Sequence, residues 1–262
     1  MSGLTGSSAG VSSVHGKPAA SKAGTRRVTD PHDLLARCFA AMLALGFVLV
    51  LANVPTSAQT PPSAAEIAAY DGLHAAAWMG DVAAIERLVA AGAAVDIRDG
   101  RSRTALHIAA HARQREAMRT LVRLGADPRA LDAQRYDTVT IAAVADDAET
   151  MRVALAIGAD PRAITSPYDG TALIAAAHLG HDENVRMLIE AGAALDHVNN
   201  LAWTALIEAI ILGDGGARHE RTVSHLVAAG ARRDIGDRNG VMPIEMARQR
   251  GYGAMVRILE SR

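Results

Sequence analysis

The sequence predicts an all-α solenoid of about six stacked helix–turn–helix units joined by hairpin-like loops. Three observations predict it. A short apolar segment containing glycine returns at a near-constant interval, and a second segment that begins with threonine keeps step with it. Half of the residues are hydrophobic but only 3% are aromatic, so alanine supplies much of the apolar surface. Such a composition suits thin, closely stacked helices better than the deep core of an enzyme.

The first repeated segment is Leu-Val-Ala-Ala-Gly-Ala at 88–93, with copies at 121–126, 155–159, 188–193 and 226–231. Its glycines are 33, 33, 34 and 38 residues apart, at Gly92, Gly125, Gly158, Gly192 and Gly230. We expect each glycine to end a helix with a positive φ angle, which glycine adopts without strain. The wider last interval indicates an insertion at 213–220, whose role the sequence leaves open.

The second repeated segment is Thr-Ala-Leu-His-Ile-Ala-Ala at 104–110, with copies at 171–177 and 204–210 and weaker ones at 137–143 and 242–247. We expect Thr104, Thr171 and Thr204 to cap helices by accepting hydrogen bonds from backbone N–H groups. In the fourth unit the pattern predicts a first helix over 172–179 and a second whose apolar stripe contains Val185, Leu188 and Ile189. The segment 63–66 has the spacing of a capping box and predicts a further helix that covers the first exposed face of the stack.

Together these segments resemble the ankyrin repeat, a unit of about 33 residues with a T-P-L-H-x-A motif, a β-turn and two helices. The resemblance covers residues 64–262, with five clear units and a degenerate sixth, at approximately 68–100, 101–133, 134–167, 168–200, 201–238 and 239–262. Alanine replaces the motif proline in the three best units, and Asp137 replaces threonine in the third. The resemblance implies that His74 and His107, the two motif histidines that remain, brace the backbone of the adjoining turn.

The first 58 residues predict an export signal. We expect a disordered basic leader over 1–37, the apolar core and cleavage region of a signal peptide over 38–58, and the repeat domain over 59–262. The run from Cys38 to Ala52 holds 15 residues without a charge. That length fits a signal peptide, whereas a membrane-spanning helix needs about 20 apolar residues. Cleavage after Ala58 would leave a periplasmic protein. Alternatively, residues 38–54 remain as an inner-membrane anchor with the repeats in the periplasm.

Composition and motifs argue against a catalytic or metal site and against binding of nucleic acid. The formal net charge is -1, and it is -4 after Ala58, where 22 arginines face 26 acidic residues. This balance gives no attraction to nucleic acid. Cys38 is the only cysteine, and the pair His178 and His181 is interrupted by the helix-breaking Gly180. Periodic aspartates near 96, 127, 160, 196 and 234 are typical of loops and caps. We therefore expect no catalytic residues, no metal, no cofactor and no small-molecule substrate.

The resemblance implies that a protein partner binds to the concave surface formed by the loop tips and the exposed sides of the first helices. Tryptophan, tyrosine and arginine often dominate the energy of such interfaces. The residues expected there are Trp78, Met79, Arg101, His111, Tyr136, Tyr168, Asn200, Trp203 and Arg238. Each tryptophan could instead pack on its own loop. We expect a non-catalytic protein-binding scaffold of the periplasm. Alternatives are an inhibitor or immunity protein for an exported enzyme or toxin, and a membrane-anchored scaffold.

Overall fold

The structure, a computed structural model, describes residues 59–261. Three expectations lie outside these residues: the leader, the apolar run and the cleavage after Ala58. Within residues 59–261 no helix has the length and apolar character needed to cross a membrane.

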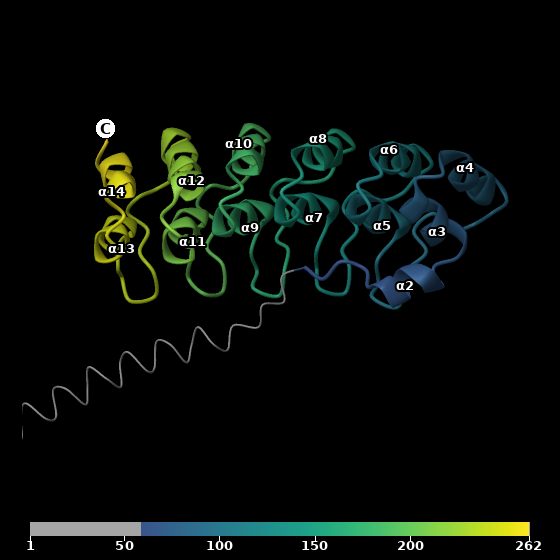
Figure 1. The fold of residues 1–262 in the computed structure, drawn as a ribbon, viewed down its shortest axis with the longest axis horizontal. Coiled ribbons are helices and arrows are strands. Elements are labelled where there is room, and N and C mark those ends of the chain that lie inside the picture. Colours follow the sequence, from purple (N-terminus) through teal and green to yellow (C-terminus); the bar gives the residue numbers. More distant parts are fainter. Residues whose placement is uncertain (1–58, 262) are drawn as a thin grey trace, which may run out of the picture. The chain divides into compact units, whose positions relative to one another are not determined.

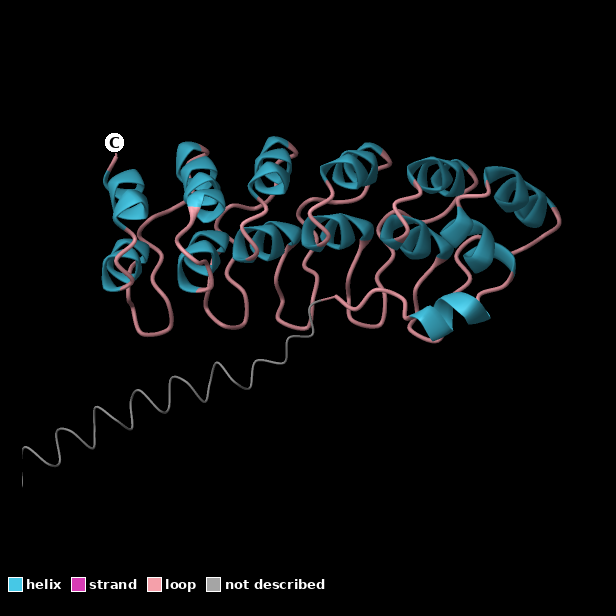
Figure 2. Ribbon diagram, viewed as in Figure 1, coloured by secondary structure: helices cyan, strands magenta, loops and turns pink. Residues whose placement is uncertain are grey.

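The described residues form thirteen helices arranged mainly in two rows (Figures 1 and 2). The first row holds the first helix of each unit: α3 (Gly72–Met79), α5 (Ala105–His111), α7 (Thr138–Val144), α9 (Ala172–His178), α11 (Ala205–Ile211) and α13 (Pro243–Gln249). The second row holds the second helices: α4 (Val82–Ala90), α6 (Arg115–Arg123), α8 (Ala148–Ala156), α10 (Asp182–Glu190), α12 (Ala217–Ala228) and α14 (Gly253–Glu260). The short helix α2 (Ala64–Ala69) lies beside the loops at the N-terminal end of the stack. The predicted all-α solenoid is confirmed.

The fourth unit shows how the repeated sequence forms a helix pair. The Thr171 side chain accepts a hydrogen bond from the Ile174 N–H at 3.3 Å and caps α9. Helix α9 ends at His178, one residue before the predicted end, and Gly180 follows with a φ of +66°. Helix α10 then buries Val185 and Leu188, as their spacing predicts, whereas Ile189 is only partly buried.

The five periodic glycines confirm the expected backbone conformation. Their φ angles lie between +85° and +102°, a region that L-residues with a Cβ atom adopt only with strain. Each glycine follows a second helix closely. Glycine at these positions therefore stops the helix and turns the chain toward the next unit.

Small side chains bring the first helices together. The residues at one equivalent position of α5, α7, α9, α11 and α13 are all alanines with no exposed surface: Ala109, Ala142, Ala176, Ala209 and Ala247. Because a methyl group occupies little space, neighbouring helices approach closely there. Leucine, isoleucine and methionine fill the space between the rows. This explains why so few aromatic residues are needed.

The two ends of the stack differ. At the C-terminal end Arg248, Arg250, Arg257 and Glu260 are exposed, as expected of a charged cap, and Arg248 pairs with Glu260 at 2.7 Å. At the N-terminal end the expected capping box is present, because the Ser63 hydroxyl accepts from the Glu66 N–H and the Glu66 carboxylate accepts from the Ser63 N–H. However, no residue of α2 is buried. The expectation that α2 covers the first exposed face was wrong, since Glu66 ties this helix to the loop between the first two units.

The insertion at 213–220 lengthens one second helix and fastens it to its neighbours. Helix α12 has 12 residues, whereas α10 has nine. From its first turn, Arg218 reaches back to Asp182 at 3.1 Å and to Asp146, two units earlier in the stack, at 2.8 Å. Tyr252 of the last unit donates a hydrogen bond to the Gly213 carbonyl. The insertion thus links four successive units.

Candidate partner-binding surface

A repeated turn shapes the loops that project beyond the first helices. We call these loops fingers and number them in chain order: 97–103, 130–136, 164–170, 197–203 and 235–241. In the first finger, the Asp99 carboxylate accepts hydrogen bonds from the Arg101 and Arg103 N–H groups at 2.8 and 2.9 Å. Asp132, Asn199 and Asp237 repeat the pattern.

The fourth unit begins with a different finger. Thr165 donates its backbone N–H to the Gly170 carbonyl at 2.7 Å, and the Ser166 hydroxyl accepts from the Tyr168 and Gly170 N–H groups. A shorter side chain thus does here what aspartate or asparagine does elsewhere, and the third finger presents Tyr168 near its tip.

Hydrogen bonds join each finger to the next. The Ala133 N–H donates to the Arg101 carbonyl at 2.9 Å, and the Asn200 N–H donates to the Tyr168 carbonyl at 3.0 Å. The second and third fingers are joined in the same way. Arg238 of the fifth finger donates to the Asn200 carbonyl at 3.1 Å. The fingers are therefore held in a fixed row before any partner arrives.

The two motif histidines brace the fingers from below, as the resemblance implies. His74 bonds through Nε2 to the Arg103 carbonyl at 3.2 Å, and His107 bonds through Nε2 to the Tyr136 carbonyl at 3.1 Å. Nδ1 of His107 accepts from the Thr104 N–H. Burial lowers the pKa of His107, which keeps the ring neutral and able to accept at one nitrogen while donating at the other.

The periodic aspartates also have the expected loop role. Asp96 accepts a hydrogen bond from the Asp127 N–H, and Asp196 accepts from the Arg232 N–H at 2.8 Å. The Asp160 carboxylate accepts from the Arg162 N–H within its own loop. These carboxylates therefore hold turns together, and two of them link the first unit to the second and the fourth unit to the fifth.

The structure places eight of the nine expected contact residues at least partly on the surface. Met79 is 66% exposed, and Arg101, Asn200 and Arg238 are exposed as well. Partly exposed are Trp78, His111, Tyr168 and Trp203. We call these eight residues, together with Leu179, the finger surface. Both tryptophans are partly buried and pack against the hydrophobic core.

Tyr136 departs from the expectation, because only 5% of it is exposed. It directly precedes the Asp137 that caps α7, and Arg103 at the equivalent place before α5 is 1% exposed. This position is enclosed where the finger returns to the helix, so Tyr136 offers little surface to a partner.

Leu179 was missed by the sequence analysis. It is 39% exposed and follows α9 at the position that Met79 occupies at the end of α3. Aligning the units on their capping residues, Asp71 and Thr171, would have found it. These two apolar side chains are exposed at equivalent positions of separate units.

Glu208 on α11 was missed as well. It lies where α5 and α7 carry buried isoleucines, and it is only 4% exposed. Asn199 donates to one of its carboxylate oxygens at 3.0 Å, and the His178 ring lies 3.3 Å from the other. The buried carboxylate joins the fourth finger to two first helices.

His178 and His181 do not converge. The Nδ1 atom of His181 lies 2.7 Å from the Ala143 carbonyl, to which it donates, whereas His178 faces Glu208. Within residues 59–261 no group of three or more histidine, cysteine, aspartate or glutamate side chains is arranged to hold a metal ion.

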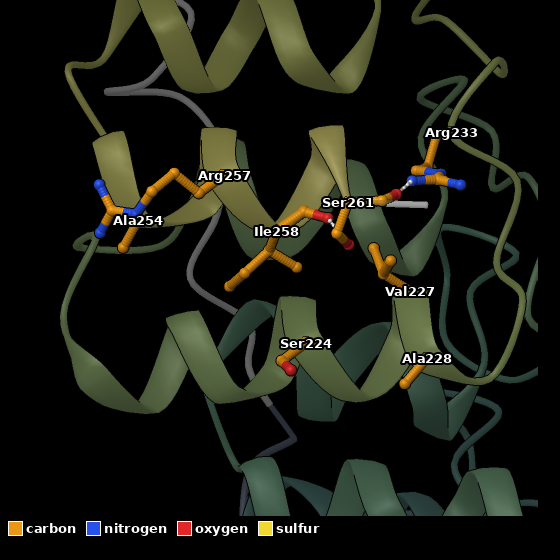
Figure 3. Close-up of a pocket in the computed structure, with 8 residues that line it drawn as sticks. All are labelled: Ser224, Val227, Ala228, Arg233, Ala254, Arg257, Ile258 and Ser261. Carbon is orange, nitrogen blue, oxygen red and sulfur yellow. Dashed lines mark hydrogen bonds between the residues drawn. The ribbon is translucent and has the colours of Figure 1, made fainter.

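A separate cavity of about 590 Å³ lies between α12 and α14, in the row of second helices (Figure 3). Arg233 closes one side by donating to the carbonyls of Leu259 and Ser261. Its lining residues are Ser224, Val227, Ala228, Arg233, Ala254, Arg257, Ile258 and Ser261. Their side chains do not gather a catalytic pair, and the cavity is built from different elements than the finger surface.

Comparisons with known proteins agree with this architecture. The family model described as ankyrin repeats (3 copies) matches residues 63–132 and 139–231. A putative ankyrin repeat protein of Escherichia coli (strain K12), YahD, is 33% identical over 93 residues, which are 35% of this chain and 46% of the relative. The alignment therefore spans about half the length of that curated relative.

Solved structures show the same fold. An ankyrin repeat domain from Acinetobacter baumannii AYE has a TM-score of 0.67 and 40% sequence identity, over 71% of this chain and 95% of that one. The ankyrin repeat protein EF0377 has a TM-score of 0.66 and 30% identity, over 72% and 98%. The human ASB11 ankyrin repeat domain, at 21% identity and a TM-score of 0.60 over 72% and 82%, shares the fold.

Proposed function

This chain belongs to the ankyrin-repeat family, and from that premise we propose that it is a non-catalytic module that binds a protein partner along its finger surface. Ankyrin repeats suggest a protein-interaction module in general. The finger surface of this chain is the specific part of the proposal.

One observation carries the proposal: exposed apolar and aromatic side chains stand on a backbone that is already fixed. Met79 and Leu179 are exposed at equivalent positions. The backbone carbonyl of Tyr168 accepts a hydrogen bond from Asn200 of the next finger. A surface that needs no ordering loses less entropy when it binds. Covering exposed apolar groups on such a surface lowers the free energy of the complex.

The place of action is also a proposal. The uncharged run from Cys38 to Ala52 and the small residue at Ala58 support export to the periplasm, with retention in the inner membrane as the alternative. The formal charge of -4 after Ala58 favours a basic partner, which an exported enzyme or toxin held by an inhibitor could be. Mass spectrometry of the protein recovered from the periplasm tests the export proposal. A chain that begins at Gln59 supports cleavage, and a chain that retains residues 38–54 favours the anchor.

Affinity capture with matched variants tests the finger surface. The triple variant Met79→Ala, Tyr168→Ala, Leu179→Ala removes exposed contacts without touching the fully buried core. The control Arg87→Ala, Arg119→Ala, Arg257→Ala changes exposed side chains on the second helices. We expect a captured protein to be lost by the finger variant and retained by the control, with both variants keeping their helicity. Retention by the finger variant would place the binding surface elsewhere.

A further inference from the structure

One arginine of the first finger is buried in an unusual setting. The side chain of Arg103 is 1% exposed, and its Nε atom donates to Asp99 at 2.7 Å. Its Nη2 atom donates to Glu66 at 2.6 Å. Arg101 donates to the same Glu66 oxygen at 2.8 Å. Glu66, from the segment before the first unit, therefore contacts two arginines of the first finger.

Glu66 satisfies these arginines incompletely. Its Oε1 atom accepts from both arginines, but its Oε2 atom accepts from the Ser63 N–H in the capping box at 2.8 Å. Only one oxygen is thus available to Arg103. The Nη1 atom of Arg103 is buried and has no hydrogen-bond partner among residues 59–261. A carboxylate with both oxygens available could pair with Nη1 and Nη2 together, the strong two-bond geometry of arginine with carboxylates.

A second buried nitrogen without a partner belongs to a residue that the charge of Arg103 affects. The Nε2 atom of His111, on α5, is buried without a hydrogen-bond partner in the described part of the chain. The charge of Arg103 is close enough to lower the pKa of His111 further than burial alone does. Buried polar groups are nearly always hydrogen-bonded in folded proteins, so the unpartnered Nη1 atom of an arginine that Glu66 already contacts indicates an imperfect occupant.

The segment that carries Glu66 is weakly attached. We call residues 59–69 the strap. Gln59 and Pro62 are buried, but no residue of α2 is, and Ile67 is only partly covered. Beyond the strap, Tyr70 stacks on His74 and donates to Asp99. Segments with few buried apolar contacts open at a small fraction of the global unfolding free energy.

We propose that Arg101 and Arg103 form a carboxylate-binding site of the finger surface, where Glu66 of the strap is a resident occupant that a carboxylate of a bound peptide segment displaces. The ligand is a peptide segment with an aspartate, glutamate or chain-terminal carboxylate placed over Arg103, and a partner of basic net charge can also present such a group. This site rests on the proposed function, since it assigns part of the partner's chemistry. Displacement uncovers the first finger and adds Arg103 to the finger surface.

A peptide copy of the strap tests the site without the natural partner. The probe is a labelled peptide with the sequence of residues 59–71 and an amidated end, titrated into the full chain by fluorescence anisotropy. The tethered strap competes at an effective concentration of about 1 mM, which the free peptide must overcome in the unaltered chain. The variant Glu66→Arg places a like charge beside the two arginines and removes that competitor. The control Glu86→Arg makes the same charge change on α4, away from the site.

We expect the peptide to bind the Glu66→Arg chain at least tenfold more tightly than the unaltered chain or the Glu86→Arg chain. A peptide with glutamine in place of Glu66 should bind none of them, and adding Arg101→Gln should weaken binding several-fold. Equal affinity for all three chains, or no binding to a helical Glu66→Arg chain, would overturn the proposal. The weaker change Glu66→Gln replaces Glu66→Arg if the latter does not fold.

Hydrogen exchange of the unaltered chain gives a second measurement that needs no variant. The amides of α2 should exchange at least tenfold faster than those of α5, and excess peptide should raise their exchange further. Protection of α2 equal to that of α5 would make the strap a permanent part of the fold and overturn its displacement. Neither measurement involves Met79, Tyr168 or Leu179, so this proposal can fail while partner binding by those residues stands.

Discussion

At the scale of single residues, the periodic glycines supply the positive φ angle that the chain adopts after five of the second helices. Gly158 has a φ of +95°, and a Cβ added there would meet only Pro128, at 3.8 Å. Space is therefore available, and the requirement for glycine is conformational. Gly100, at the tip of the first finger, has neither a positive φ nor any atom within 4 Å of an added Cβ. Because neither glycine is crowded, comparing the two isolates the cost of a side chain at positive φ.

We predict that Gly158→Ala lowers the free energy of unfolding by about 1 kcal/mol or more, because alanine is strained at positive φ. The change Gly100→Ala should alter it by less than about 0.5 kcal/mol. Chemical denaturation followed by circular dichroism measures both. Equal effects of the two changes would contradict the conformational role of Gly158.

His111 has a property that the sequence could not indicate. It was expected to contact a partner, and part of it does reach the surface. Burial, and then the positive charge of Arg103, lower the pKa of His111 to about 4. Charge on Arg103 and His111 together is unfavourable because both groups lie in a partly enclosed region.

We therefore predict that the protein loses stability on acidification through His111. The unfolded chain takes up a proton near the ordinary histidine pKa of about 6.5, whereas the folded chain takes it up only near pH 4. Between these values the unfolded state binds more protons, so stability falls as pH falls, by at most about 1.4 kcal/mol per pH unit. Denaturation at pH 7, 6 and 5 should show a shallower pH dependence for His111→Gln. An unchanged slope would contradict the lowered pKa.

At the scale of elements, the sequence predicts the helix pairs well because each helix has a local start and a local stop. Thr171 and Gly180 bound α9 through interactions within a few residues, so its predicted end differs from the observed one by a single residue. The site was less predictable. The attachment of α2 depends on an ion pair between Glu66 and Arg103, which lie far apart in the chain, and it has no periodic signal. The burial of Tyr136 is seen only in the structure, where Arg103 is buried at the equivalent position of the preceding unit.

The insertion shows what local signals omit. Gly213 to Gly216 look like an extended turn in the sequence, but in the structure they form the contact between α11, α12 and the last unit. Gly215 has a φ of +72°, and a Cβ added to it would overlap the Tyr252 ring. Gly240 has a similar φ of +75° but open space around it.

We predict that Gly215→Ala destabilises the protein more than Gly240→Ala does, by roughly 1–3 kcal/mol, because both changes strain the backbone but only the first overpacks an aromatic contact. Combining Gly215→Ala with Tyr252→Ala should remove most of this additional cost, since the ring is no longer present to be displaced. Thermal unfolding of these three variants and of Tyr252→Ala alone measures the difference. If Gly215→Ala and Gly240→Ala melt together, the insertion is not packed on Tyr252.

At the scale of the whole described unit, each helix pair packs on its sequence neighbours. Helix α8 lies between α6 and α10, whereas α14 has α12 on one side only. Stability in such a stack is a sum of terms for units and for the interfaces between neighbours. The effect of a core change should therefore depend on its place along the stack, even when the local chemistry is the same.

Two methionines offer a matched test. Met151 on α8 and Met255 on α14 both have no exposed surface, so replacing either by alanine removes similar contacts and costs about 2–5 kcal/mol locally. Met255→Ala should raise hydrogen exchange in α13 and α14 while α5 and α6 keep their protection, because the last unit can open without its distant neighbours. Met151→Ala interrupts the middle of the stack and should raise exchange on both sides of α8. Uniform loss of protection in both variants would mean that the stack unfolds as one cooperative block.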